Sequence, residues 1–318
     1  MGVHTVAKCR AQGHFTHAST FHAFSLVPAP FAVIAPAQIS TADPFVARRA
    51  FTSHGVCIGV RTNEPALLDR VPTCFPPGWE ESPGSRVDAW FSLLREPVGG
   101  GKRIRYGLYE DEEKLDEGFR LTRVLDRMDS AIRLRVGRRS PDRVFVHAGA
   151  VAWNNWAIVI PGRSGSGKTS LVAALVTAGA TYYSDEYAVL DARGLLHPYT
   201  RALSFRQGEH RRLRRSAVGD LGGRHGTEPI PVGLVIQTRF RDGASWEPAV
   251  LSAGRGALAL FANALAGEER PAFAFSVLAR AAAGAVSLEG DRGAAQSAAS
   301  AILAYASSIH SSGTGSRQ

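Results

Sequence analysis

The sequence is 318 residues long and 45% hydrophobic, which is enough for a packed core in one large domain or two ordinary ones. Its net charge of +9 favours anionic partners such as phosphates, but nearly all the basic residues are Arg, a coding-type bias from which we expect no nucleic-acid partner. No run approaches the roughly 18 apolar residues of a membrane span, so we expect no membrane partner.

The cysteines and residues 1–40 indicate in which cellular compartment the protein is expected. Cys9, Cys57 and Cys74 form no C-x-x-C pair and leave an odd thiol, which fits a reducing compartment better than a disulfide framework. Residues 1–40 have apolar stretches broken by prolines and lack the basic start of a signal peptide. We therefore expect a cytoplasmic protein in which residues 1–40 form a disordered tail.

Residues 41–140 carry a mixed pattern that predicts a small α+β unit. Alternation of apolar residues indicates its strands, and an Asn ahead of a Glu-Pro pair indicates the start of a helix. The expected elements are a strand over 53–62, a helix over 63–71 capped by Asn63, a loop over 76–85, and a hairpin of strands over 86–94 and 103–111.

A helix follows these strands. Its apolar residues recur at helical spacing and predict one buried face, while Arg123, Arg127 and Arg133 are expected on the surface. The polar, basic segment 137–143, interrupted by Pro141, predicts the boundary of the unit. The residues of the apolar face are Leu121, Val124, Leu125, Met128 and Ile132.

Residues 141–310 alternate between strand-like and helix-like patterns, as in an α/β domain. Asn154-Asn155 separates two apolar strands and predicts a tight turn, and the second strand runs directly into a glycine-rich segment. The expected elements are strands over 144–153, 156–162, 180–191 and 231–240, helices over 169–179, 258–265, 274–283 and 293–307, and a disordered tail over 311–318.

The glycine-rich segment "IPGRSGSGKTS" matches G-x-x-x-x-G-K-[ST] through Gly162, Gly167, Lys168 and Thr169. A strand before it and a helix after it would aim backbone N–H groups at phosphate oxygens. Lys168 would reach the β- and γ-phosphates of ATP, and Thr169 would complete the coordination of Mg²⁺. The expected nucleotide-binding residues are Gly162, Arg163, Ser164, Gly165, Ser166, Gly167, Lys168, Thr169 and Ser170.

Phosphoryl transfer also requires carboxylates, which hold the metal and orient the attacking hydroxyl. Asp185 and Glu186 come one strand after the predicted helix, and a strand parallel to the first would bring them to the same edge of the sheet. Adjacent strand residues point to opposite faces, so one would face the transferred phosphate and the other the metal or a second partner. The alternative interpretation of this pair is an exposed strand end.

Residues 143–210 contain four segments in a fixed order, which are "VHAGAVAW", "GRSGSGKTS", "YYSDEYAVLD" and "GLLHPYTRALSFR". This ordered set resembles the catalytic domain of HPr kinase/phosphorylase, a family related in fold to phosphoenolpyruvate carboxykinase. The resemblance implies an α/β fold with a P-loop nucleotide-binding domain of the carboxykinase-like type, joined to a smaller N-terminal α+β unit. It also implies an ATP-dependent, Mg²⁺-requiring kinase acting on a hydroxyl such as serine in a protein or peptide, and a homo-oligomer as in many relatives.

The resemblance further implies roles for three residues. Asp185 would accept the proton of the attacking hydroxyl, Glu186 would contribute to the metal environment, and His147 would position or electrostatically tune Asp185. From the residues alone, His147 is equally consistent with a structural histidine in an apolar strand. Arg201 and Arg206 alternate with apolar residues on an expected strand, and would either neutralise the transferred phosphate or be solvated edge arginines.

Departures from the family keep other functions open. The second acidic residue of the family is usually Asp and is Glu186 here, and the acidic-x-Arg-Gly signature is replaced by the basic segment 208–226. That segment has no interleaved aromatics, which predicts a mobile surface loop and not a nucleic-acid site. Phosphorylase activity is therefore unsupported, and HPr is not the expected acceptor. The alternatives are a non-catalytic nucleotide-binding regulatory or scaffold module and, less favoured, a carboxykinase-like small-molecule enzyme.

Overall fold

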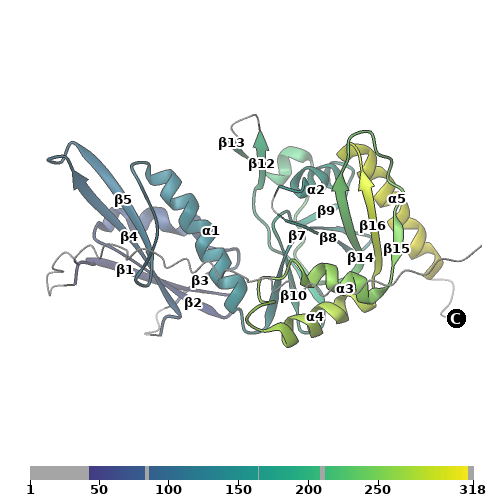
Figure 1. Cartoon of the computed structure of the whole chain (residues 1–318), viewed down its shortest axis with the longest axis horizontal. Helices are drawn as coiled ribbons and strands as arrows, with labels where there is room; N and C mark the ends of the chain where they lie inside the picture. Colours follow the sequence, from purple (N-terminus) through teal and green to yellow (C-terminus); the bar gives the residue numbers. More distant parts are fainter. Residues whose placement is uncertain (1–42, 83–85, 164, 208–211, 314–318) are drawn as a thin grey trace, which may run out of the picture. The chain divides into compact units, whose positions relative to one another are not determined.

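The computed structural model describes residues 43–82, 86–163, 165–207 and 212–313, which form a mixed α and β protein with several sheets (Figure 1). The fold class predicted from the sequence is confirmed at that level. Within these ranges, no helix has both the length and the apolar character needed to span a membrane. The expected tail over 1–40 and the loop residue Ser164 lie outside the described residues.

The first sheet is six-stranded, in the order β3-β1-β2-β4-β5-β6, and packs against a 3-10 segment and one long helix. His54 and Gly55 have positive φ and close a hairpin just inside the strand expected over 53–62. The elements are β1 (Ala47–Ser53), β2 (Val56–Thr62), η1 (Pro65–Cys74), β3 (Glu80–Glu81), β4 (Ala89–Val98), β5 (Arg103–Glu110), β6 (Glu113–Gly118) and α1 (Leu121–Arg139).

Two predictions in this region are corrected. The helix expected after Asn63 is 3-10, and Asn63 does not cap it because its side-chain Oδ1 accepts the N–H of Arg95 instead. The prediction that Arg133 lies on the surface of α1 is wrong, since it is only 7% exposed. Asp129 stands one turn earlier on the same helix face and pairs with Arg133 at 2.9 Å, which allows both charges to be buried.

The second large sheet is eight-stranded and has helices on both faces. Alternate residues of β8 serve the two faces: Ala157 and Val159 pack with α3 and α4, whereas Ile158 and Ile160 pack with α2 and α5. The strand order is β11-β10-β7-β8-β14-β16-β15, and β9 also pairs with β7.

The bounds of these elements agree with most of the expected ones in the second half of the chain. They are β7 (Arg143–Trp153), β8 (Trp156–Pro161), α2 (Lys168–Thr177), β9 (Thr181–Ser184), β10 (Tyr187–Asp191), β11 (Leu195–His197), β12 (Leu203–Gln207), β13 (Arg212–Ser216), η2 (Val218–Leu221), β14 (Ile230–Phe240), β15 (Ala249–Leu251), α3 (Ala253–Phe261), α4 (Pro271–Ala283), β16 (Val286–Arg292) and α5 (Ala295–Gly313).

Strand β7 lies between the strands whose ends carry the candidate site. It forms the predicted hairpin with β8, whose turn holds Asn154 and Asn155 at positive φ. On its other side β7 pairs with β9 and β10, also antiparallel, so these strands run in the same direction as β8. Pro161 at the end of β8 pairs with Ala148, and Ser184 at the end of β9 pairs with Ala150. The two strand ends therefore flank one short stretch of β7.

Three other expectations differ from the structure. The strand expected over 180–191 is interrupted between β9 and β10, at Asp185 and Glu186. The segment expected as a surface loop over 208–226 contains β13, which pairs with β12, and η2; residues 208–211 lie outside the described residues. Helix α5 continues to Gly313, so residues 311–313 of the expected tail are helical, and 314–318 lie outside the described residues.

One hydrophobic cluster contains side chains from both large sheets. It includes Val124 and Ile132 of α1 together with Phe145 of β7 and Tyr187 of β10. Burial of these apolar side chains against one another holds α1 next to the β9–β10 junction. The polar residues on the same face of α1 are thereby brought to the strand ends that carry the site.

Candidate functional site

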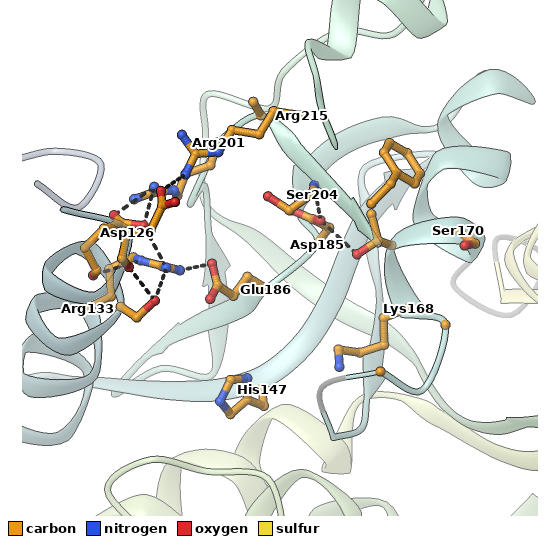
Figure 2. A pocket seen from close by; sticks show the side chains of 17 residues that line it. Asp126, Arg133, His147, Lys168, Ser170, Asp185, Glu186, Arg201, Ser204 and Arg215 are labelled. Carbon is orange, nitrogen blue, oxygen red and sulfur yellow. Dashed lines mark hydrogen bonds and ion pairs between the residues drawn. The ribbon is translucent and has the colours of Figure 1, made fainter. Parts of the chain in front are cut away.

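A cavity of ≈ 600 Å³ is bounded by the glycine-rich loop, the β9–β10 junction and α1 (Figure 2). It brings together nine of the residues singled out from the sequence, which are His147, Gly165, Gly167, Lys168, Thr169, Ser170, Asp185, Glu186 and Arg201. Gly162, Arg163 and Ser166 belong to the loop but do not line this cavity. Arg206 lies on β12, and its side chain is outside what the structure describes.

The loop between β8 and α2 has the backbone geometry that its glycines allow. Gly165 and Gly167 have φ of 88° and 83°, which favour glycine, and α2 begins directly after them at Lys168. Lys168 is 8% exposed, and its Nζ donates to the carbonyls of Gly162 at 2.6 Å and Arg163 at 2.8 Å. A cation and the N-terminal end of a helix thus lie at one wall of the cavity, where they favour an anion.

Asp185 faces this loop and is held by three donors. Its Oδ2 accepts from Thr169 Oγ1 at 3.0 Å and from the backbone N–H of Ser204 at 3.2 Å, and its Oδ1 accepts from Tyr182 Oη at 2.9 Å. Burial raises the pKa of Asp185, and the bonds from Ser204, Tyr182 and Thr169 partly offset that rise. The carboxylate is therefore fixed in orientation and more basic than an exposed aspartate.

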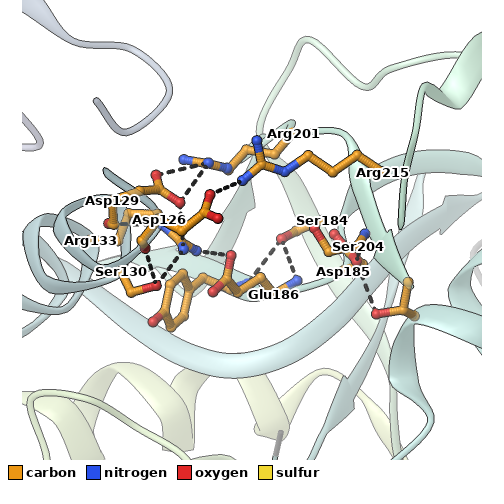
Figure 3. A network of polar contacts seen from close by, with 12 residues as sticks. Asp126, Asp129, Ser130, Arg133, Ser184, Asp185, Glu186, Arg201, Ser204 and Arg215 are labelled. Atoms are coloured by element: carbon orange, nitrogen blue, oxygen red, sulfur yellow. Dashed lines mark hydrogen bonds and ion pairs between the residues drawn. The ribbon is translucent and has the colours of Figure 1, made fainter. Parts of the chain in front are cut away.

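Glu186 points the opposite way, toward α1 (Figure 3). Its carboxylate pairs with Arg133, whose Nη2 lies 2.9 Å from Oδ2 of Asp129. Arg201 Nη2 in turn lies 2.9 Å from Oδ1 of Asp129. Burial lowers the pKa of Arg133, but Glu186 and Asp129 outweigh it and raise that pKa overall. The four residues form a chain of alternating charge, and the carboxylate expected near a metal is engaged by a guanidinium.

His147 lines the cavity from β7. Its ring lies beside Tyr187, with 4.7 Å between the ring centroids, and its backbone carbonyl accepts from the N–H of Gly162 at 3.0 Å. Burial lowers the pKa of His147, and the charges of Lys168 and Arg133 lower it further against the opposing charge of Glu186, which favours the neutral imidazole. His147 is not among the hydrogen-bond partners of Asp185 in the described chain, which are the three donors named above.

Arg201 reaches the cavity from the connection before β12 and not from a strand, as the alternation had suggested. Its side chain is half-buried and pairs with the carboxylate of Asp129. Arg201 is therefore not a solvated arginine on an edge strand. A second arginine, Arg215 of β13, lines the same side and pairs with the exposed Asp126 of α1 at 3.1 Å. The α1 side of the cavity therefore carries paired charges of both signs.

Several residues of the site were missed from the sequence. Asp129 and Arg133 lie four residues apart on the apolar face of α1, and charged residues at that spacing on a buried face were a usable signal. Tyr182 precedes Asp185 by three residues, but nothing in an aromatic strand distinguishes a hydrogen-bond donor from a core side chain. Ser204 contributes only its backbone N–H, for which no side-chain pattern exists.

No family model and no curated protein matches the sequence. The cavity and its residues are therefore the basis for any functional assignment.

Proposed function

We propose that this protein is an ATP-dependent kinase of the HPr-kinase-like type, with a P-loop domain of the carboxykinase-like type, which transfers the γ-phosphate of ATP to a hydroxyl of a protein or peptide. The observation that carries the proposal is the meeting of Lys168, Thr169 and Asp185 in one cavity, with 3.0 Å between Thr169 Oγ1 and Asp185 Oδ2. An anion-binding loop and a buried, basic carboxylate are the two parts that hydroxyl phosphorylation requires.

The loop is the part that would bind the phosphates. Lys168 Nζ donates hydrogen bonds to two carbonyl oxygens of the loop. A phosphate oxygen can take the place of these acceptors and form a charge-assisted hydrogen bond with the ammonium group. The N–H groups at the start of α2 add donors along the helix dipole. Lys168 would hold charge on the transferred group, and the loop would fix its position for in-line attack.

Magnesium fits the oxygen donors of the site. Thr169 and Asp185 supply a hydroxyl and a carboxylate, which are hard ligands, and nucleotide-bound Mg²⁺ takes only one or two carboxylates in addition to phosphates. Among the described residues, no group of three or more His, Cys, Asp or Glu is placed to hold a metal. Phosphate oxygens of the nucleotide would therefore supply the remaining ligands of the ion. When bound, Mg²⁺ would neutralise charge on the phosphates.

We assign to Asp185 the role of proton acceptor. The acceptor oxygen forms a bond to the γ-phosphorus while the bond from that phosphorus to the ADP oxygen breaks, and the hydroxyl proton passes to the Asp185 carboxylate. A raised pKa suits this role because it makes the carboxylate a better proton acceptor. Thr169, Tyr182 and Ser204 keep the carboxylate oriented during the transfer.

Label transfer from γ-labelled ATP to proteins of a cell lysate tests the proposal. We expect transfer by the wild type and a loss of at least about a hundredfold in Asp185→Asn, which keeps the shape of the side chain and removes the proton acceptor. Asp242→Asn, an exposed carboxylate on the connection after β14, is the matched control and should behave as the wild type. Transfer that survives Asp185→Asn unchanged would rule out the assigned role.

A binding-only regulatory module is the second candidate. The observation in its favour is the ion pair between Glu186 and Arg133, which engages one of the two carboxylates expected to act. Under this alternative the wild type binds ATP with Mg²⁺ but transfers no label, and Asp185→Asn changes nothing that label transfer reports. Lys168→Ala should weaken nucleotide binding under both proposals, so it tests the loop alone.

A further inference from the structure

Arg292, at the end of β16, lies directly behind the glycine-rich loop although 125 residues separate it from Gly167. It is 3% exposed. Its Nη2 donates to the carbonyl oxygen of Gly167 at 3.1 Å, and its Nη1 donates to the carbonyl of Gly293 at 3.2 Å. The guanidinium therefore connects the last residue of the loop to the backbone directly after β16.

This contact fixes the orientation of one peptide plane. The Gly167 carbonyl also accepts the N–H of Leu171 at 3.2 Å, the first hydrogen bond of α2, so it points along the helix. In a trans peptide the C=O and the following N–H point in opposite directions. The N–H of Lys168 must therefore point out of the N-terminal end of α2, toward the space that the loop encloses. Holding the oxygen on one side holds the donor on the other.

The sequence of the loop accommodates this arginine. Gly167 has a φ of 83°, and a Cβ at this position would collide with Nη2 of Arg292. Glycine is thus needed here for the backbone angle and for the close approach of the guanidinium. Part of the reason for glycine at this motif position is therefore a residue that the motif itself does not contain.

The charge of Arg292 is also unusual. Buried charges are normally paired, yet within the described residues Arg292 makes no ion pair with a carboxylate, and its Nε has no hydrogen-bond partner. Its donors go to backbone carbonyls and its guanidinium lies 5.7 Å from the ring centroid of Phe240. A phosphate held by the loop would bring a negative charge to the other side of the peptide plane that Arg292 holds.

We propose that Arg292 is a positioning residue of the anion-binding loop, which fixes the Gly167 carbonyl so that the Lys168 N–H faces a bound phosphate and which contributes a buried positive charge behind it. The inference rests on the part of the proposed function that assigns phosphate binding to the loop, and it does not depend on phosphoryl transfer. The ligand class is a diphosphate or triphosphate, which the proposed function assigns to the loop; the phosphate would face the N–H of Lys168, and Arg292 acts from the opposite side of the same peptide plane.

The test uses ADP and inorganic pyrophosphate as probes with the full-length protein. We expect Arg292→Gln to weaken the binding of both by about tenfold, since a charge-assisted bond and an oriented donor are lost. Arg239→Gln, which removes an exposed arginine from the neighbouring strand β14, is the matched control and should leave both affinities unchanged. Pyrophosphate separates the phosphate contribution from any contribution of the base.

A second readout distinguishes positioning from a general structural effect. In the wild type, ADP should move the amide resonance of Lys168 in a ¹⁵N-labelled sample, and in Arg292→Gln this movement should be lost while resonances of the first sheet stay in place. If the Gln variant does not fold, Arg292→Lys carries the test through the same resonance, because it keeps a buried cation but cannot bond two carbonyls with a planar fork.

The outcomes separate the two proposals. A wild type that binds neither ADP nor pyrophosphate would overturn the role of Arg292 and the proposed function together. A wild type that binds both, with unchanged affinity and an unchanged Lys168 response in the Arg292 variants, would overturn the role of Arg292 and leave the kinase proposal standing. A weakening of both probes by about tenfold with a lost Lys168 response, confined to the Arg292 variants, would support the inference.

Discussion

Asp185 is under two opposing influences. Burial raises its pKa, and hydrogen bonds from Ser204, Tyr182 and Thr169 lower it. Of these donors, only the Tyr182 hydroxyl can be removed without touching the backbone or the glycine-rich loop. Tyr182 is fully buried, so phenylalanine fills its place with little change in packing.

Tyr182→Phe should therefore move the pH dependence of phosphate transfer in a defined direction. The hydroxyl lowers the pKa of Asp185, so its removal raises that pKa further. If the ionised carboxylate accepts the proton, activity is lost as pH falls through this pKa, and the ascending limb of the pH–rate profile shifts to higher pH. Measurement of label transfer across the acidic and neutral range checks the shift.

Tyr183→Phe provides the control for this prediction. The Tyr183 hydroxyl donates to the carbonyl of Glu228 at 2.7 Å and does not contact Asp185. Its removal should leave the limb at the wild-type pH. Identical profiles for the wild type and Tyr182→Phe would contradict the assignment of Asp185 as the titrating group.

Residues of the site that belong to a short sequence pattern were predicted, and residues whose partners are distant in the sequence were not. Lys168 and Thr169 were predicted because a fixed spacing encodes the loop, and Asp185 because it follows the loop by one helix and one strand. Arg133 and Arg292 were not, because each acts on a partner more than 50 residues away, and a single sequence does not encode which charged side chains meet across that distance. Their charge favoured a surface location on statistical grounds.

Helix α1 is the element that brings the first half of the chain into the site. It carries Asp129 and Arg133, which link Glu186 to Arg201 through buried ion pairs. Removing one member of such a chain leaves a buried charge without its partner, and that cost is larger than the net gain from the pair itself. The helix should therefore be sensitive at Arg133 and tolerant at an exposed position such as Arg127.

Arg133→Met should lower the free energy of unfolding by about 3 kcal/mol, the lower end of what breaking a buried ion pair costs, because Asp129 retains Arg201 and Glu186 is only partly buried. Arg127→Met, at an exposed position of the same helix, should change it by less than about 0.5 kcal/mol. Urea unfolding of the three proteins measures the difference. Equal stability of the two variants would contradict a structural role for the ion-pair chain.

Secondary-structure elements were predicted correctly where the sequence contains residues typical of a particular turn. Asn154 and Asn155 fixed the β7–β8 hairpin because both tolerate positive φ. Strand β16 was missed because its sequence VSLEGDR interrupts apolar alternation with acidic residues and a glycine. The pattern over 180–191 was continuous, so the break between β9 and β10 could not be predicted; it occurs where Asp185 and Glu186 turn to different partners.

The described molecule has a hydrophobic cluster common to both large sheets, with Phe145 and Tyr187 packed among residues of α1 and the first sheet. Because a shared core couples the unfolding of its parts, we expect one cooperative transition in urea, with coincident midpoints by tryptophan fluorescence and far-UV circular dichroism. Trp79 and Trp90 report on the first sheet, and Trp153 and Trp246 on the second. Two separated transitions would show that the cluster does not couple them.

The described molecule thus combines a glycine-rich loop, a buried carboxylate and a helix from the first half of the chain around one cavity. We propose that Asp185 converts phosphate binding into phosphate transfer. Its most direct test is the amount of label transferred from γ-labelled ATP for each mole of ATP bound, compared among the wild type, Asp185→Asn and Asp242→Asn. We expect this ratio to fall by at least about a hundredfold in Asp185→Asn alone, with ATP binding retained. A ratio equal in all three proteins would contradict it.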